Sequence, residues 1–206
     1  MLTADEWREV ALLPEAVAVA LPERAEAAHV EIRGEAGRGK STSLIAAAAS
    51  LERAGRRVAE EYLPTGARNY RTALSSSLDV FCLDEAQRLS GRERGRLLAE
   101  ASRHGVRLLL GTHESFAPLF ARRKMPLRVV WLDALDEAHF RAALVRRLEW
   151  AALPDVEHAT LGEDALEALR ARFGTDLRAA ERFLYAAFQA SVRQPITMSA
   201  VDLGLV

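Results

Sequence analysis

The segment from Gly34 to Ser41 constrains the fold of this chain more than any other feature. Its sequence is GEAGRGKS, which matches the pattern G-x-x-x-x-G-K-[ST] at every fixed position. In such a segment the glycines let backbone N–H groups turn inward onto phosphate oxygens, and the helix that follows directs its positive end at them. A glycine-rich turn without a ligand is the alternative. The phosphate-binding interpretation additionally requires a strand before the segment and a helix after it.

Both of these elements are predicted. The stretch His29–Arg33 alternates apolar and polar residues and leads into the loop, and Lys40–Arg53 has a helical pattern. Further strands are predicted from short apolar runs bounded by turn signals at 80–83, 106–110 and 129–132, with a weaker one at 57–62. Helices are predicted at 91–104, where Ser90 and Glu93 form a capping box, and at 115–123. Alternating strands and helices indicate a parallel sheet that is buried on both faces.

The pattern changes after about Asp133. An amphipathic helix is predicted at 137–151, a second one opens with a capping box of Thr160 and Glu163 and ends at Gly174, and a third covers 176–191 before Pro195. The predicted fold is therefore α/β, a P-loop NTPase core with a five-stranded parallel sheet in residues 1–132. A small all-helical lid subdomain follows in residues 133–206.

Composition excludes several classes of protein. The 206 residues carry a net charge of −1, so no global field attracts the chain to nucleic acid or to a membrane. The single cysteine, Cys82, excludes an intramolecular disulfide, and its apolar surroundings indicate a buried structural thiol rather than a reactive one. We expect no signal peptide, and the sequence has no apolar run of about 18 residues. We expect a cytoplasmic protein without membrane insertion.

The loop predicts a site for ATP and Mg²⁺. Lys40 is one of only two lysines, with Lys124, and can reach the β- and γ-phosphates, while the Ser41 hydroxyl can ligate Mg²⁺. The residues expected to bind the nucleotide are Gly34, Glu35, Ala36, Gly37, Arg38, Gly39, Lys40, Ser41 and Thr42.

A second motif, LDVFCLDE, is an apolar strand that ends in Asp84 and Glu85. Asp84 is expected to hold Mg²⁺, directly or through water, and Glu85 to polarise the water that attacks the γ-phosphate. An acidic helix cap is the alternative interpretation, but a cap needs only one carboxylate. With the loop, this pair predicts ATP hydrolysis.

Two further positions fit the same chemistry. The strand at 107–111 ends in Thr112 and His113, where a polar side chain can orient the attacking water from the side opposite Glu85. Thr112 is the first candidate and His113 the second, since a histidine at a strand end is more often structural. In the segment FGTDLR, Arg178 lies in the first turn of a helix and can pair with the γ-phosphate, thereby distinguishing ATP from ADP.

Taken in order, these segments resemble the AAA+ ATPases over nearly the whole chain. They correspond to a Walker A loop at 34–41, a Walker B pair at 84–85, a polar strand end at Thr112, a G-x-D-x-R segment at 174–178 and a closing PITMSAV. The segments LDEAQRLS and LLLGTHESFAPL are most similar to those of bacterial helper ATPases of transposition and of the related type II secretion ATPases.

The resemblance implies ATP-dependent assembly into rings or filaments, with an active site shared between neighbouring copies. An arginine of the neighbour would complete it, and the segment after the Thr112 strand offers Arg122 and Arg123. In AAA+ assemblies that act on nucleic acid, the regions around the second motif commonly line the central surface. Arginines there could contact DNA, although a solvated face is the alternative; the candidates are Arg68, Arg71, Arg92 and Arg96, with Arg88 and Arg94 nearby.

The function indicated by the sequence is that of a Mg²⁺-dependent ATPase that oligomerises and remodels or switches a protein partner. Its setting would be DNA-associated, in transposition, replication or recombination. The alternative is a nucleotide-dependent switch or scaffold with little turnover of its own. A small-metabolite kinase fits poorly, because its lid is usually inserted in the α/β core, whereas the extra helices here are appended after it. A separate DNA-recognition domain is not expected, since only about 28 residues precede the first strand.

Overall fold

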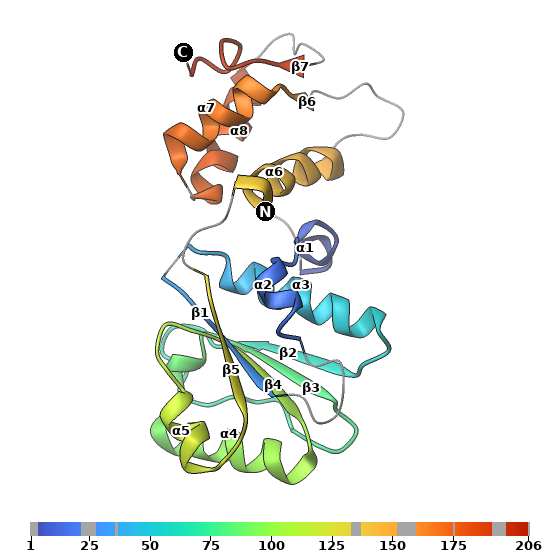
Figure 1. Ribbon diagram of the computed structural model, residues 1–206, viewed down its shortest axis with the longest axis vertical. Coiled ribbons are helices and arrows are strands. Elements are labelled where there is room, and N and C mark those ends of the chain that lie inside the picture. The colour runs from blue at the N-terminus through green and yellow to red at the C-terminus, as the bar shows by residue number, and fades with distance from the viewer. Residues whose placement is uncertain are drawn as a thin grey trace. The chain divides into compact units, whose positions relative to one another are not determined.

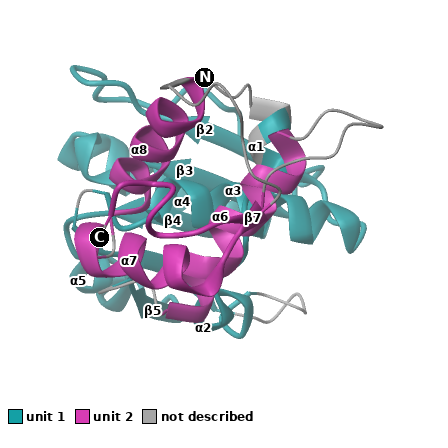
Figure 2. Ribbon diagram, turned by 90° about the horizontal axis from the view of Figure 1, so that it is seen from above, with its two compact units in different colours: residues 1–133 teal, residues 134–206 magenta. Residues whose placement is uncertain are grey.

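The computed structural model describes residues 4–21, 28–35, 37–132, 137–151, 160–174, 176–190 and 197–205. The chain forms two compact units, Met1–Asp133 and Ala134–Val206, which Figure 2 shows in different colours. Each unit encloses hydrophobic residues of its own.

Unit 1 contains a five-stranded parallel sheet with the strand order β2-β3-β4-β1-β5 (Figure 1). The strands are β1 (His29–Arg33), β2 (Val58–Tyr62), β3 (Val80–Asp84), β4 (Arg107–Thr112) and β5 (Leu127–Trp131). The predicted parallel sheet is confirmed. Because β1 lies between β4 and β5, Arg33 at its carboxyl end is paired with Thr112 on one side and Trp131 on the other.

Helices cover both faces of this sheet: α3 (Lys40–Arg53) lies on one side, α4 (Gly91–His104) and α5 (Ala117–Arg122) on the other (Figure 1). Side chains of β3 alternate between the two layers. Val80 and Cys82 pack in the layer that contains Leu44 of α3, whereas Phe81 packs with Leu97 of α4. Cys82 is buried as expected, and burial raises the pKa of its thiol. It is therefore a protonated core residue.

The start of α4 corrects part of the predicted capping box. The Ser90 hydroxyl accepts a hydrogen bond from the Glu93 backbone N–H at 3.3 Å, as predicted. The reciprocal bond is absent among these residues, since the Ser90 N–H donates to the Arg68 carbonyl at 3.0 Å and the Glu93 carboxylate pairs with Arg96. The Ser90 N–H is thus taken by a residue outside the helix, and the Glu93 carboxylate by an arginine of α4 itself, so neither completes the cap.

Two short helices precede the sheet that the sequence pattern does not predict: α1 (Ala4–Val10) and α2 (Glu15–Ala18). Val10 and Val17 are buried in unit 1. Arg8 of α1 pairs with Glu52, near the end of α3, and with Glu60 of β2. One guanidinium therefore ties the first helix to both a later helix and the edge strand.

Unit 2 consists mainly of α6 (Glu137–Ala151), α7 (Glu163–Phe173) and α8 (Leu177–Ala190). The helical subdomain is confirmed, and its core includes Phe140, Leu144, Leu166, Leu169, Ala180 and Leu184. Within its described residues it also holds a short parallel pair, β6 (Thr160–Leu161) with β7 (Thr197–Met198), that an all-helical prediction omits.

Two helix boundaries were predicted in unit 2: the first is wrong, and the second lies outside the described residues. The predicted capping box of Thr160 is wrong: Gly162 is the N-cap of α7, without a side-chain cap, and Thr160 belongs to β6, with its hydroxyl 3.2 Å from that of Thr197. The predicted stop at Pro195 lies outside the described residues. Each helix in the described part of the chain is too short or too polar to cross a membrane.

Candidate nucleotide-binding site

The glycine-rich loop connects the carboxyl end of β1 to the first residue of α3. Gly37 and Gly39 have φ angles of 83° and 82°, in the left-handed region that favours glycine, and Gly39 is the N-cap of α3. Its carbonyl accepts the hydrogen bond of the Ser43 N–H at 2.8 Å. The predicted context of strand, loop and helix is therefore present. Ala36 of the predicted set lies outside the described residues.

Lys40 points back across this loop. Its ammonium donates to the carbonyls of Gly34 and Glu35, both at 2.8 Å, and lies 3.3 Å from Nδ1 of His113. The residue is 5% exposed, and burial lowers the pKa of its amine while the charges of Glu85 and Asp84 oppose that shift. The Lys40 ammonium is thus a buried cation at the mouth of the loop, with two carboxylates near it.

Ser41 and Asp84, the two predicted magnesium ligands, are brought together. The Ser41 side chain is hydrogen-bonded to the Asp84 carboxylate, which also accepts from the Glu85 N–H at 2.9 Å. Asp84 is 8% exposed. Burial raises the pKa of its carboxyl, and the Ser41 hydrogen bond is the largest opposing effect. Asp84 lies directly above Gly111 of β4, where an added Cβ would come within 2.6 Å of Oδ1.

Glu85 is held by the turn that follows β3. Its φ of 59° places it in the left-handed region before η1 (Ala86–Arg88). The carboxylate accepts from Gln87 Nε2 at 2.8 Å and pairs with Arg88 Nη2, also at 2.8 Å. Oε1 lies 3.7 Å from Nε2 of His113. Gln87 and Arg88 thus hold the Glu85 carboxylate in place, and the sequence pattern predicted this role for neither residue.

At the end of β4 the structure favours His113 over Thr112. Thr112 is fully buried, and its hydroxyl donates to the Glu114 carbonyl and accepts from the Glu114 N–H, each at 3.0 Å. Thr112 therefore closes a local turn. The imidazole of His113 instead lies within reach of both Lys40 and Glu85. His113, the second candidate, therefore occupies the place expected for Thr112.

Arg122 and Arg123, at the end of α5, differ in their contacts. Arg123 donates to the Gly95 carbonyl at 3.1 Å, which fixes it against α4. Arg122 is exposed and its side chain has no partner among the described residues. The free side chain is the better candidate for a contact with a second copy. Arg178 is exposed near the start of α8 in unit 2. The pKa of Arg147 is lowered to about 10, first by the burial of Arg147 and second by the charge of Arg178.

Arg96 does not form the free phosphate-binding face predicted with Arg92. Its guanidinium pairs with Glu93 at 2.6 Å and with Glu100 at 3.6 Å, and its central carbon lies 4.0 Å from the ring centroid of Tyr70. These contacts satisfy the charge, so the prediction for Arg96 is corrected: it is a structural residue.

Arg88 and Arg94 are also engaged, whereas three other arginines of the predicted patch remain available. The side chains of Arg68, Arg71 and Arg92 are exposed and have no ion pair in the described parts of the chain. Arg68 and Arg92 lie near each other, because the Arg68 carbonyl accepts from the N–H of Ser90 at the start of α4. The available positive surface is therefore smaller than the sequence suggests.

No protein-family model and no curated protein matches the chain. Several solved structures do. Among them are DnaA from Aquifex aeolicus with bound AMPPCP (TM-score 0.55, 19% identity, 84% of this chain and 60% of that one) and the replication initiator DnaA bound to AMPPCP and single-stranded DNA (TM-score 0.55, 16% identity, 85% and 60%).

A third structure, a DNA replication initiation factor, matches with a TM-score of 0.53 and 15% identity over 79% of this chain and 55% of that one. The chain thus spans about 60% of the length of the first two structures. At these identities the likeness concerns the fold. Together with the sheet order and the loop, it identifies an α/β P-loop NTPase fold with a helical subdomain, which this chain shares with DnaA.

Proposed function

We propose that this chain is an AAA+ protein that binds ATP with Mg²⁺ and hydrolyses it, releasing the γ-phosphate. The observation that carries the proposal is the meeting of five side chains at the carboxyl ends of β1, β3 and β4. Lys40 and Glu85 lie on opposite sides of His113, and Ser41 is bonded to Asp84. This is the constellation that phosphoryl transfer to water needs: a phosphate cradle, oxygen ligands and a base. Residues 34–42 would form the cradle.

Lys40 supports the binding half of the proposal. Its ammonium already lies inside the loop, held by two backbone carbonyls. A triphosphate offers it charged oxygens, which form stronger hydrogen bonds than neutral carbonyls do. The helix that starts at Lys40 adds its positive end to the same place. Two of the structures that share this fold hold AMPPCP, an ATP analogue.

The donor set of Ser41 and Asp84 suits Mg²⁺, which prefers hydroxyl, carboxylate and phosphate oxygens. A bound Mg²⁺ would neutralise charge on the phosphates. Asp84 is nearly buried, and its pKa is raised by that burial. A cation with two charges favours the ionised carboxylate and would lower this pKa again.

Glu85 and His113 provide the groups that act on water. We assign to Glu85 the role of polarising the attacking water, because it is the remaining carboxylate beside the loop. His113 is assigned the orienting role in place of Thr112, since its ring lies between Glu85 and Lys40. Arg178 keeps its proposed role as a reporter of the γ-phosphate.

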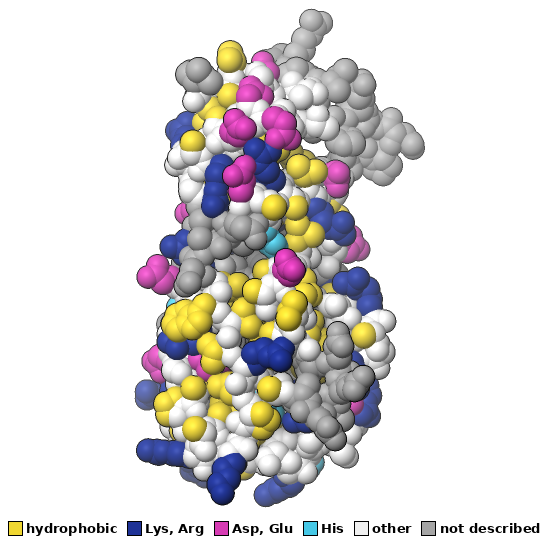
Figure 3. All heavy atoms as spheres, viewed as in Figure 1, with side chains coloured by type: hydrophobic (Ala, Val, Ile, Leu, Met, Phe, Trp, Pro, Cys, Tyr) yellow, Lys and Arg dark blue, Asp and Glu magenta, His cyan; other side chains and the backbone are white. Residues whose placement is uncertain are grey.

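Self-assembly into a ring or filament is the second part of the proposal. Figure 3 shows hydrophobic side chains gathered over the face of unit 1 on which β5 lies. On this edge strand Val129 and Trp131 are exposed, Trp131 by 54%, with the Arg33 guanidinium 4.1 Å from the indole centroid. Arg122, free at the end of α5, belongs to the same unit and would complete the neighbour's site. An exposed apolar edge strand suits an interface between copies.

We further propose that the ATPase works on DNA, together with a protein partner that the transposition-helper resemblance suggests. One structure with the same fold is described as bound to single-stranded DNA. In this chain, Arg68, Arg71 and Arg92 supply exposed, unpaired positive charge near one another.

A nucleotide-dependent switch with little turnover is the second candidate, and the ion pair of Glu85 with Arg88 favours it. A carboxylate held by a guanidinium at 2.8 Å is not free to turn toward a water molecule. The isolated chain is therefore expected to hydrolyse ATP slowly.

The test is the variant Glu85→Gln. It should bind ATP within about threefold of the wild-type affinity and reduce the rate of phosphate release by about 100-fold. A variant that hydrolyses ATP at the wild-type rate would remove Glu85 from the mechanism. Light scattering in ADP and in a non-hydrolysable ATP analogue, with and without DNA, tests assembly, and an unchanged monomer in all four conditions would contradict it.

A further inference from the structure

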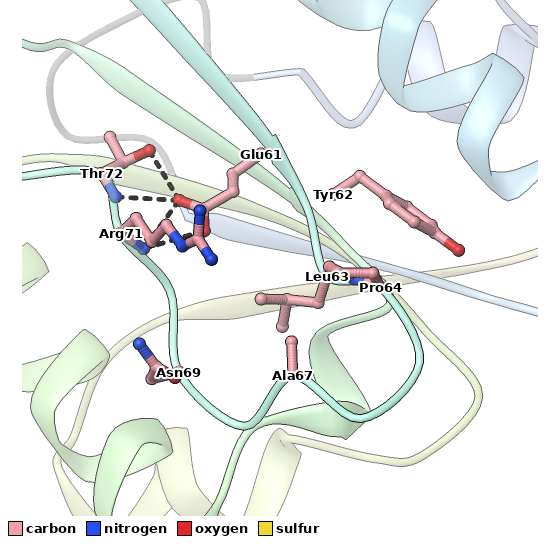
Figure 4. Close-up of a pocket in the computed structure, with 8 residues that line it drawn as sticks. All are labelled: Glu61, Tyr62, Leu63, Pro64, Ala67, Asn69, Arg71 and Thr72. Carbon is pink, nitrogen blue, oxygen red and sulfur yellow. Dashed lines mark hydrogen bonds between the residues drawn. The ribbon is translucent and has the colours of Figure 1, made fainter.

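An exposed arginine is more available to a ligand when the carboxylate near it is occupied by other donors. Unit 1 has such an arrangement beside a groove of about 580 Å³ at the end of β2 (Figure 4). The Glu61 carboxylate there accepts hydrogen bonds from the backbone N–H groups of Arg71 and Thr72 and from the Thr72 hydroxyl, at 2.7–3.1 Å (Figure 4). The Arg71 side chain is left exposed and has no ion pair among the described residues.

A comparable arrangement lies at the start of α8 in unit 2. Arg178 and Glu181 are three positions apart on this helix, a spacing at which an arginine and a glutamate are neighbours and can form an ion pair. Glu181 is also the only carboxylate three or four positions away from Arg178 in the sequence. Arg178 is nevertheless exposed, and in the described part of the chain it has no ion pair. The Glu181 carboxylate is therefore engaged elsewhere.

Its partner is Arg147 of α6. The guanidinium of Arg147 and the carboxylate of Glu181 form an ion pair that joins α6 to α8, and the two side chains are only 14% and 28% exposed. After burial, the charge of Arg178 is the second cause that lowers the pKa of Arg147, so the two arginines lie near enough to repel each other. Arg147 and Arg178 thus compete for one carboxylate, and the less exposed of the two holds it.

We propose that Arg147 is a positioning residue, which occupies Glu181 and thereby keeps Arg178 available to the γ-phosphate. This inference rests on the proposed role of Arg178 as the reporter of ATP. Two effects act in the same direction. The ion pair removes the carboxylate that Arg178 would otherwise bind, and the like charge of Arg147 disfavours a position of Arg178 close to Glu181.

Removal of Arg147 should therefore change the partner of Glu181. A half-buried carboxylate that loses its cation is costly, and Arg178, one helical turn away, has the right spacing to replace Arg147. The guanidinium of Arg178 would then be held on the surface of α8. It would act on Glu181 in place of the nucleotide.

The first measurement is the ratio of the dissociation constants of ADP and of the ATP analogue AMPPCP, obtained by calorimetric titration with Mg²⁺. In Arg147→Met this ratio should fall about fivefold, because Arg178 is drawn to Glu181. Arg147→Met combined with Glu181→Gln should restore the wild-type ratio, since no carboxylate then competes for Arg178. Glu181→Gln alone should keep the ratio within about twofold of the wild-type value.

The second measurement needs no nucleotide. Phenylglyoxal modifies accessible arginine side chains, and mass spectrometry after proteolysis gives the rate of modification at Arg178. This rate should fall about threefold in Arg147→Met, where the guanidinium is ion-paired, and should return to the wild-type value in the double variant. A purely structural role of Arg147 has the opposite signature, because loosening of unit 2 would speed the modification of Arg178. Arg182, exposed on the same helix, is the internal reference.

Two further variants keep the test decisive. Arg147→Lys retains a cation opposite Glu181 and should keep both the nucleotide ratio and the reactivity of Arg178 near wild type. Arg182→Met is the matched control, since it removes a like charge one turn from Arg178 while Arg147 still holds Glu181; it should behave as wild type. If Arg147→Met does not fold, Arg147→Gln, which also removes the charge but keeps a polar side chain, takes its place.

The possible failures are distinct. If Arg178→Ala binds ADP and AMPPCP with the wild-type ratio, the proposed reporter role fails, and the phenylglyoxal rate still tests the positioning by Arg147. If Arg178→Ala lowers the ratio but Arg147→Met changes neither the ratio nor the reactivity of Arg178, the positioning role is overturned. A loss in Arg147→Met that Glu181→Gln does not restore would also overturn it, because the carboxylate would not be the cause.

Discussion

Nδ1 of His113 lies 3.3 Å from the ammonium of Lys40, and its other ring nitrogen lies 3.7 Å from the carboxylate of Glu85. Because an ammonium only donates hydrogen bonds, this placement requires a lone pair on Nδ1 and puts the ring proton on Nε2, toward Glu85. His113 therefore links the residue proposed to bind phosphate to the residue proposed to polarise water.

The first prediction concerns His113. His113→Ala should lower kcat for ATP hydrolysis by about tenfold to 100-fold, with ATP affinity changed much less, because water loses its orienting group. Steady-state phosphate release and nucleotide titration measure the two quantities. His104→Ala, at the end of α4, is the matched control. Thr112→Val is expected to act on stability rather than on kcat, so a folded Thr112→Val variant with no turnover would restore Thr112 to the catalytic role.

The second prediction concerns Gly111. An alanine there would bring its Cβ within 2.6 Å of Asp84 Oδ1 and 2.7 Å of Leu44 Cδ1. We expect Gly111→Ala to displace Asp84, to weaken Mg²⁺-dependent nucleotide binding by about tenfold and to destabilise the fold by about 1–3 kcal/mol. Calorimetric titration of nucleotide with and without Mg²⁺ measures the first effect.

The control for Gly111 is Gly95 in α4. An added Cβ at Gly95 has its nearest neighbour, Arg123 Nη2, at 3.7 Å, an ordinary contact. Gly95→Ala should therefore raise stability by up to about 1 kcal/mol. If both variants bound Mg²⁺ and nucleotide equally well, the close packing of Gly111 beneath Asp84 would not matter for the site.

The third prediction is a pH dependence of stability from His29. Burial and the nearby charge of Arg107 lower the pKa of His29 from 6.5 to about 4, and its Nδ1 accepts from the Leu108 N–H at 3.0 Å. Between these pH values the unfolded chain binds the extra proton and the folded chain does not, so stability falls as the pH drops from 6.5 toward 4. His29→Gln lacks this titration. From pH 7 to pH 4.5 the wild type should lose about 2 kcal/mol more than the variant in denaturant unfolding. Parallel curves for the two proteins would contradict the assignment.

The fourth prediction concerns Arg122 in a shared site. Arg122→Ala and Lys40→Ala should each be inactive, because one lacks the donated arginine and the other the phosphate-binding lysine. Mixed 1:1, they should recover about a quarter of the wild-type rate, since that share of random head-to-tail interfaces joins an intact loop to an intact Arg122. Arg123→Ala, whose side chain is bonded to Gly95, should retain turnover without a second variant. Absence of recovery in a mixed assembly would place Arg122 outside the site.

The strands and the loop could be predicted because their signals are local. Short apolar runs mark β3 and β4, and Gly37 and Gly39 supply the left-handed backbone that the loop uses. The side-chain partners could not be predicted in the same way. The helical spacing of Arg92 and Arg96 indicates a common face, but Tyr70, 26 positions earlier, covers Arg96. Which arginine remains free depends on chain segments that pattern rules do not bring together.

The same reason applies to the site. The order Thr112-His113 at a strand end does not reveal which side chain turns toward Lys40, because the Glu114 turn decides it by binding the threonine hydroxyl. The spacing of Glu85 and Arg88, three positions apart, was a usable signal for their ion pair. The position of Tyr62 beside Arg88 could not be predicted, since it depends on the pairing of β2 with β3.

The place of β1 between β4 and β5 has a consequence for biosynthesis. Val30 pairs with Leu109 on one side and with Arg128 on the other, so the strand that carries the phosphate loop emerges first and gains its partners last. Pairing between segments far apart in sequence forms slowly, because a long stretch of chain must be ordered before the new contacts stabilise it. A nascent chain that has not reached Trp131 cannot complete this strand's neighbours. The loop that follows β1 is therefore flanked by both neighbouring strands only in molecules whose sheet has been translated through Trp131.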